Sequence, residues 1–252
     1  MLTHEREGEI AMMLARRAYL YSMLHVVFGS EPDRERTVSV FGDETTAAFA
    51  ETRDALAGEE WASVAARRLG ESGRSLAECV QEALSCVEAV SSQVGDEAFW
   101  EQLRSDYRAL FLVPGDSFVR PWESPYTGKE AMLFQVSTLD VRSFYHEAGL
   151  KLQSEKHFPD DHIAAMMDYL GRTARDAYEA YADGRDDEAA RLLETQRSFL
   201  EKHVLTWIDA FADAVIAHDA HAAYGAFAGG AAAFARLDCA RMGALAAELS
   251  NE

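Results

Sequence analysis

The chain has few cysteines and no long hydrophobic run, and these two shortages exclude several classes of protein. Its three cysteines, Cys79, Cys86 and Cys239, are too few and too widely spaced for a disulfide scaffold or a zinc site. Buried reduced thiols are typical of the cytoplasm, where we expect this protein to act. No stretch approaches ~18 consecutive apolar residues, so the sequence predicts no membrane-spanning helix.

Positive charge is also scarce. The 252 residues carry 24 Lys and Arg against 43 Asp and Glu, a formal net charge of −19. Binding of DNA or RNA needs basic patches that displace counterions from phosphates, so the composition argues against nucleic-acid partners. A basic partner would be attracted, although salt limits the effect to steering over about 8 Å. Solubility alone, or a salty habitat, explains the charge equally well.

Apolar residues recur at helical spacing along nearly the whole chain. Three stripes cover residues 76–94, 163–181 and 199–216. Near the N-terminus, Arg16 and Arg17 precede an apolar run as in an export signal, but that run follows one helix face and predicts a first helix of the mature fold. No stretch alternates long enough for a sheet. We predict an all-α bundle of roughly ten helices that forms a single domain over residues 1–252.

Proline is rare except in the segment LFLVPGDSFVRPWESPY, residues 110–126. It holds three of the five prolines, Pro114, Pro121 and Pro125. Proline fixes φ and pushes the preceding residue toward extended conformations, so we expect a long, stiff, non-helical loop here. Long loops in compact domains usually carry function, and the aromatic residues of this one suit a peptide-binding groove. The alternative is that the aromatic side chains pack inward and only cover the core.

Acidic residues gather at the start of the helix predicted in HFPDDHIAAMMDYLG, residues 157–171. Pro159 fits the first turn of that helix, and Asp160 and Asp161 fit its positive end. An exposed aspartate pair also binds an arginine guanidinium through bidentate hydrogen bonds. The alternative is a metal-dependent helical enzyme, although no HExxH or repeated ExxH spacing is present. Its ligands would be Glu155, His157, Asp161 and His162.

A third stretch, QRSFLEKHVLTWIDAF at residues 196–211, places His203 on an apolar helix face. A lone histidine in that position is usually a core residue with satisfied hydrogen bonds, and we interpret His203 in this way. Glycines in AFAGGAAAF are expected to permit close helix packing. The chain has no recognisable nucleophile motif and no phosphate-binding glycine loop, so nothing in the sequence predicts an enzyme.

These stretches occur in the order typical of one family, the TorD/DmsD/NarJ-like chaperones. DYRALFLVPGDSFVRPWESPY resembles the family's Y-x-x-LF-x-x-PG...P-[YW]-E-S-x-Y segment. FPDDHIAAMMDYLGRTA resembles its PDH helix, and QRSFLEKHVLTWIDAFADAV resembles its FL-x-x-H-[LV]-x-x-W helix. The opening ARRAYLYSMLHVVFGSEPDRE is similar to its first helix. The resemblance spans residues 10 to 238.

The resemblance implies a cytoplasmic chaperone that is not an enzyme and needs no cofactor of its own. Its partner would be the catalytic subunit of a molybdoenzyme of the DMSO reductase type, bound through its twin-arginine leader peptide, through its body, or through both. The chaperone would hold that subunit for insertion of the molybdenum cofactor before export. A NarJ-like assembly factor that ignores leaders is the alternative. The oligomeric state, including a homodimer, is left open.

The resemblance also implies which residues bind the leader. It associates the proline–tryptophan pair and the PDH motif with this role, and it matches two apolar residues to groove positions. An extra aspartate in Pro-Asp-Asp-His, and Asp168 where the helix usually has Glu or an apolar residue, depart from the family pattern. They leave open which aspartate is the functional acid. The peptide-binding residues that we predict are Leu110, Phe111, Pro121, Trp122, Glu123, Ser124, Tyr126, Asp160, Asp161 and His162.

Overall fold

The computed structural model describes residues 4–128, 136–151 and 159–250. In these ranges the structure contains helices and two isolated β-bridges but no β-strand, which confirms the all-α prediction. None of the described helices combines the length and the apolarity that a membrane span requires. The α-helices are α1 (His4–Gly29), α2 (Arg34–Thr37), α3 (Asp43–Leu56), α4 (Ala62–Ala65), α5 (Leu76–Ser91), α6 (Glu97–Tyr107), α7 (Ser124–Thr127), α8 (Val136–Glu147), α9 (Ile163–Ala182), α10 (Asp186–Phe199), α11 (Ile208–His218) and α12 (Ala223–Leu249).

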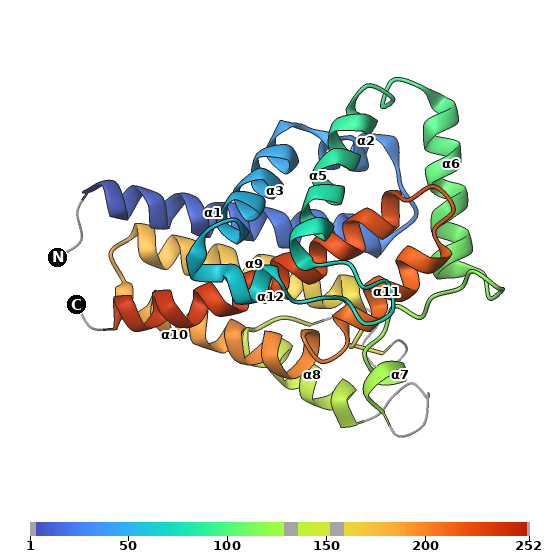
Figure 1. Ribbon diagram of the computed structural model, residues 1–252. Helices are drawn as coiled ribbons and strands as arrows, with labels where there is room; N and C mark the ends of the chain where they lie inside the picture. The colour runs from blue at the N-terminus through green and yellow to red at the C-terminus, as the bar shows by residue number, and fades with distance from the viewer. Residues whose placement is uncertain (1–3, 129–135, 152–158, 251–252) are drawn as a thin grey trace.

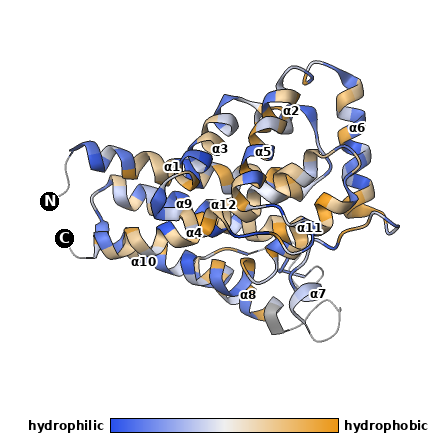
Figure 2. Ribbon diagram, in the orientation of Figure 1, coloured by the Kyte–Doolittle hydropathy of each residue, from blue (hydrophilic) through white to orange (hydrophobic). Residues whose placement is uncertain are grey.

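The long helices form a bundle whose most buried member is α12. Helices α1 and α9 pack along each other, α10 packs on α9 and α12, and α12 also packs on α5 and α11. In Figure 1 the long helices run side by side across the view, while α3, α5 and α6 stand at a steep angle above them. Apolar residues colour the inner faces of the bundle in Figure 2, as the helical stripes in the sequence predict.

Small residues let α12 approach its neighbours closely. A Cβ added to Gly230 would meet the Ala83 Cβ at 2.8 Å and the Phe49 ring at 3.0 Å. Similarly, a Cβ on Gly171 of α9 would lie 2.8 Å from Ser22 Oγ of α1. The prediction that the glycines of AFAGGAAAF permit close packing is confirmed at Gly230, because any side chain there would push α12 away from α5.

The N-terminal arginine pair belongs to the fold. Arg17 is 2% exposed inside the bundle, and its guanidinium pairs with Asp238 of α12 at 2.9 Å. Arg17 Nη2 also donates to Gln196 Oε1 at 2.6 Å, and Tyr21 donates its hydroxyl to Asp238 Oδ2 at 2.7 Å. A buried arginine in α1 therefore connects three helices, and this agrees with the prediction of a helix in the mature fold.

The proline-rich segment leaves the helical bundle at a π-helical turn, Arg108–Leu112, that directly follows α6. Val113 then adopts the extended conformation expected before Pro114. Ser124 differs from the expectation, because it starts the short helix α7 although Pro125 follows it. Proline is tolerated in the first turn of a helix, where its missing N–H has no intrahelical partner.

Candidate functional site

Two of the motifs that lie far apart in the sequence are joined by backbone hydrogen bonds. The Ile163 N–H donates to the Pro121 carbonyl at 2.8 Å, and the Glu123 N–H donates to the Asp161 carbonyl at 3.0 Å. Trp122 and His162 lie opposite each other in this short antiparallel pairing, with ring centroids 5.3 Å apart in an edge-to-face arrangement. The proline-rich loop and the Pro-Asp-Asp-His segment therefore form one structural unit.

This pairing corrects the predicted start of α9. We expected Pro159 in the first turn and the two aspartates at the positive helix end, but α9 begins at Ile163 with His162 as its N-cap. The His162 Nδ1 accepts the Ala164 N–H at 3.1 Å. Because Asp161 and His162 pair with the loop in an extended conformation, neither belongs to the helix. The sequence signal for a helix start was correct to within a few residues, but Pro159 and both aspartates lie before the helix.

The aspartate pair is not exposed, which contradicts the expectation of a surface acid pair. Asp160 and Asp161 are both 0% exposed. Asp160 Oδ2 accepts hydrogen bonds from the Arg142 guanidinium at 2.5 Å, so an arginine of the chain itself occupies this carboxylate. Asp161 Oδ2 accepts the Ser124 N–H at 2.8 Å, while its Oδ1 has no hydrogen-bond partner among the described residues. The two acids thus differ in their partners, a guanidinium for Asp160 and a backbone N–H for Asp161.

The third motif reaches the same unit through His203, which lies in a second π-helical turn, Leu200–Val204. Its Nδ1 lies 3.2 Å from Glu123 Oε2, and its Nε2 lies 3.0 Å from Asp140 Oδ2. His203 is 3% exposed, and this confirms it as a core histidine with satisfied hydrogen bonds. Burial raises the pKa of Glu123, an effect that the hydrogen bond from His203 opposes. Turns of π-helix are rare and often mark functional positions.

The predicted apolar groove residues face the core. Leu110 and Phe111 are 1% and 5% exposed, and the Phe111 ring packs among four other aromatic rings of the core. Tyr126 is partly buried against Trp207 and donates its hydroxyl to the Arg120 carbonyl. Trp122 and Pro125 are partly buried, and Pro121 is buried. The structure thus brings the predicted residues together but leaves few of them accessible.

Sequence reasoning missed two kinds of residue in this region. The first are Asp140 and Arg142 of α8, whose charges meet His203 and Asp160 but follow no motif in the sequence. The second are Leu112 and Val113, which are 53% and 58% exposed beside the buried Leu110–Phe111 pair. The apolar run LFLV contained this signal, because a helical turn at the surface of a bundle buries only the side chains on its inner face.

The site contains a histidine whose ionisation opposes folding. Burial, assisted by repulsion from nearby His25, lowers the pKa of His162 to about 4. The unfolded chain, in which the histidine pKa is ~6.5, therefore binds an extra proton between these two values. Stability is fully present above the unfolded pKa and is lost as the pH falls toward the folded one.

We expect His162 to make the protein about 2 kcal/mol less stable at pH 5 than at pH 7. Urea unfolding at the two pH values measures this difference. His162→Asn is the matched control, because asparagine is a good N-cap but does not titrate in this range. An equal loss of stability in the variant would show that the pH dependence comes from other groups.

No cluster of His, Cys, Asp and Glu among the described residues has a geometry that would hold a metal ion. Glu155 and His157 of the metal alternative lie outside the described residues. The described part of the site contains the Trp122–His162 ring pair, the backbone hydrogen bonds between the two segments, and the buried carboxylates of Asp160 and Asp161.

Comparisons with known proteins point to a single family. The family model described as nitrate reductase delta subunit matches residues 71–213. The chain is 28% identical over 233 residues to the chaperone protein TorD of Shewanella loihica, a match that covers 90% of this chain and 93% of that one. It is also 30% identical to TorD of Photobacterium profundum, over 55% of this chain and 63% of the relative. TorD of Vibrio cholerae (El Tor) is 31% identical, over 54% and 60% respectively.

Proposed function

The chain belongs to the nitrate reductase delta subunit family, the TorD/DmsD/NarJ-like chaperones of molybdoenzyme maturation, and from this premise we propose that it binds the twin-arginine leader of its client. It is a chaperone and not an enzyme, as the resemblance predicted. We further propose that its client is a catalytic subunit of the DMSO reductase type, held in the cytoplasm until the molybdenum cofactor is inserted. In this proposal residues 1–252 act as one domain.

The observation that supports leader binding is the pairing of Trp122 with His162 directly beside Asp161. Asp160 is already bound to Arg142, so we assign the arginine of the leader to Asp161, whose Oδ1 has no hydrogen-bond partner among the described residues. Asp161 is fully buried. A leader arginine therefore reaches it only when the loop at 121–124 moves away from His162.

Burial of leader side chains provides enough free energy to open the loop at 121–124 and bind the leader. Each leader side chain that is fully buried contributes roughly 1.5–3 kcal/mol, and micromolar affinity requires about 8 kcal/mol. Several apolar leader residues would offset the cost of opening the loop. The net charge of −19 would steer the basic end of the leader toward the protein at low salt.

Calorimetric titration with a twin-arginine leader peptide and with a scrambled copy tests the proposal. We expect Trp122→Ala and Asp161→Asn each to weaken leader binding about tenfold, because one removes aromatic contact and the other removes the charge. Asparagine is chosen because its oxygen still accepts the Ser124 N–H. Equal heats for leader and scrambled peptide would remove the claim.

A matched control is available at Trp61, another partly buried tryptophan that packs against the core outside this region. Trp61→Ala should leave leader affinity unchanged. If Trp122→Ala and Asp161→Asn lower the melting temperature strongly instead of the affinity, both residues have a structural role only.

The second candidate is a NarJ-like assembly factor that binds the body of the client and ignores its leader. It is favoured by the burial of Leu110, Phe111 and both aspartates, since these side chains offer little surface to a peptide in this conformation. A pull-down with leaderless client separates the two functions. Capture of the leaderless subunit at full strength, together with no heat from the leader peptide, would select the second.

A further inference from the structure

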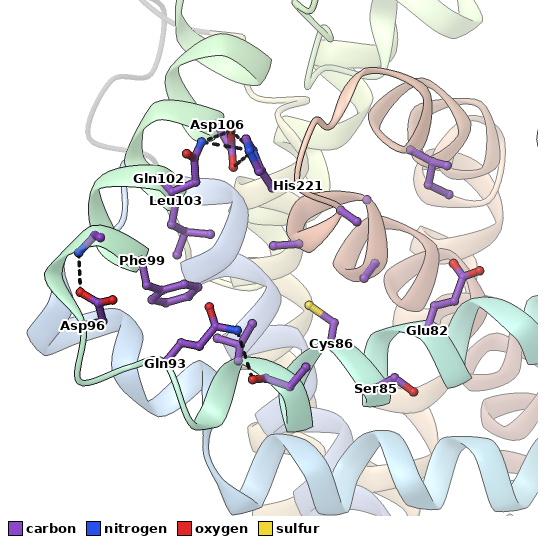
Figure 3. Close-up of a pocket in the computed structure, with 18 of the residues that line it drawn as sticks. Glu82, Ser85, Cys86, Gln93, Asp96, Phe99, Gln102, Leu103, Asp106 and His221 are labelled. Atoms are coloured by element: carbon purple, nitrogen blue, oxygen red, sulfur yellow. Dashed lines mark hydrogen bonds and ion pairs between the residues drawn. The ribbon is translucent and has the colours of Figure 1, made fainter.

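A separate groove lies between α5, α6 and the start of α12 (Figure 3). Its volume is about 800 Å³, and it shares no lining residue with the peptide-binding residues predicted from the sequence. Small or apolar side chains form much of the walls, among them Cys86, Val90, Phe99, Leu103 and Ala226. A groove of this size and lining is typical of a ligand-binding site, which usually occupies ~300–1,000 Å³.

Three polar side chains meet at one end of the groove, while Glu82, Ser85, Gln93 and Asp96 line other parts of it. Asp106, 7% exposed, accepts the Gln102 side-chain N–H at 3.0 Å and lies 3.0 Å from His221 Nδ1. Figure 3 shows these three side chains directed toward one another, with Phe99 and Cys86 lining the apolar part. A carboxylate at the end of an apolar groove favours a cation there and disfavours an anion.

The remaining charged residues of the groove are also predominantly acidic. Glu82 and Asp96 also line it, while Arg74 is its single arginine and is paired with Glu82 at 3.2 Å. With histidine neutral, three carboxylates and one guanidinium give the groove a formal charge of −2. A ligand that has apolar side chains and a net positive charge matches this pattern.

The backbone holds the polar end in an unusual conformation. Ala222, which lines the groove, has a φ of 65°, the single positive value among the described residues other than glycine. Such a conformation persists only where neighbouring contacts enforce it, and it is common at ligand sites. Here Asp219 enforces it, because its carboxylate accepts the N–H groups of His221 and Gly225. The same contacts hold His221 toward Asp106.

We propose that this groove is a second peptide-binding site, which takes a short apolar segment of the client that carries one arginine or lysine. The proposal rests on the chaperone function but not on leader binding at Trp122 and Asp161. The apolar side chains of the segment lie between α5, α6 and α12, and its cation pairs with Asp106. Because a chaperone of this family acts on a polypeptide, the occupant is a peptide rather than a metabolite.

Fluorescence anisotropy tests the site with a labelled peptide of leucine and alanine that carries one arginine, and with copies that carry glutamate or leucine in its place. Ala89 lines the groove, and Ala89→Trp would fill part of it. We expect Ala89→Trp to weaken binding of the arginine peptide at least about tenfold. Ala244→Trp, at an exposed position of α12 outside the groove, is the matched control and should have no effect.

The charge at the polar end is tested separately. Asp106→Asn keeps an oxygen for Gln102 but removes the charge, so we expect about tenfold weaker binding of the arginine peptide and little change for the leucine copy. Equal affinity of the wild-type protein for the arginine and glutamate peptides would overturn the proposal, even if Asp106→Asn does not fold. So would equal effects of Ala89→Trp and Ala244→Trp.

Titration with the leader peptide keeps the two sites distinguishable. Ala89→Trp should bind the leader with unchanged affinity, and Trp122→Ala should bind the arginine peptide with unchanged affinity. If Ala89→Trp loses the leader while Trp122→Ala keeps it, the leader itself occupies the groove, and the proposal of a second site is wrong. Absence of leader binding at both sites, with the arginine peptide still bound, would contradict leader binding alone.

Discussion

The Asp238→Ala variant is expected to unfold about 10 °C below the wild-type protein, a loss of about 3–5 kcal/mol. The carboxylate that it removes is 2% exposed and binds both Arg17 and Tyr21. Without it the guanidinium keeps Gln196 Oε1 as a partner, while its Nη1 has none among the described residues even in the wild type. A buried cation would lose its counter-ion, which is among the most costly single changes to a core.

Thermal unfolding of Asp238→Ala measures this effect against a surface control. Asp168 pairs with Arg172 one turn away on α9, and both side chains are partly exposed. Asp168→Ala should cost only about 0.3–0.5 kcal/mol, because water screens such a pair. Similar losses in the two variants would mean that the buried pair contributes no more than the exposed one.

The Arg142→Gln variant is expected to lose about 3 kcal/mol of stability. Its guanidinium donates to Asp160 Oδ2 at 2.5 Å, and the Asp160 side chain is only 1% exposed. Removing the cation leaves a buried carboxylate with weaker compensation for its lost hydration. Arg172→Gln is the matched control, since it breaks the exposed pair with Asp168 and should change the stability little.

The same variant distinguishes the two candidate acids for leader binding. If the leader arginine pairs with Asp161, as proposed, Arg142→Gln should leave leader affinity nearly unchanged as long as the protein is folded. If Asp160 is the acid instead, removal of the competing internal arginine should strengthen binding. Calorimetry at a temperature well below the unfolding transition makes the comparison.

Helices were the most predictable part of this protein. The stripes at residues 76–94 and 163–181 correspond to α5 and α9. The stripe at residues 199–216 covers the end of α10, the π-helical turn Leu200–Val204 and most of α11. A helix face repeats every few residues, so its signal is contained in a short window of sequence. The helix boundaries were predicted less accurately. Helix α9 begins at Ile163 rather than at Pro159, because backbone pairing with the loop competes with helix formation at that point.

The motifs identified segments that lie in contact in the fold, but they did not indicate the orientation of the side chains. Trp122 and His162 were predicted to act together, and they lie in contact. The aspartates were expected at the surface, yet both are buried, since the loop pairing turns one toward Ser124 and the other toward Arg142. Nothing in the Pro-Asp-Asp-His letters indicates that an arginine on α8 would be there.

Local patterns of the chain were therefore enough to establish the helical class, the order of the motifs and the family. Each of these depends on residues that are near one another in sequence, or on letters that can be compared directly. Which carboxylates are buried, which arginine pairs with which acid, and where a groove stays open depend on contacts between different helices and loops, such as Arg17 with Asp238 or Asp106 with His221. Such contacts follow from how the helices pack, and helix packing sums many small apolar terms that no single motif records.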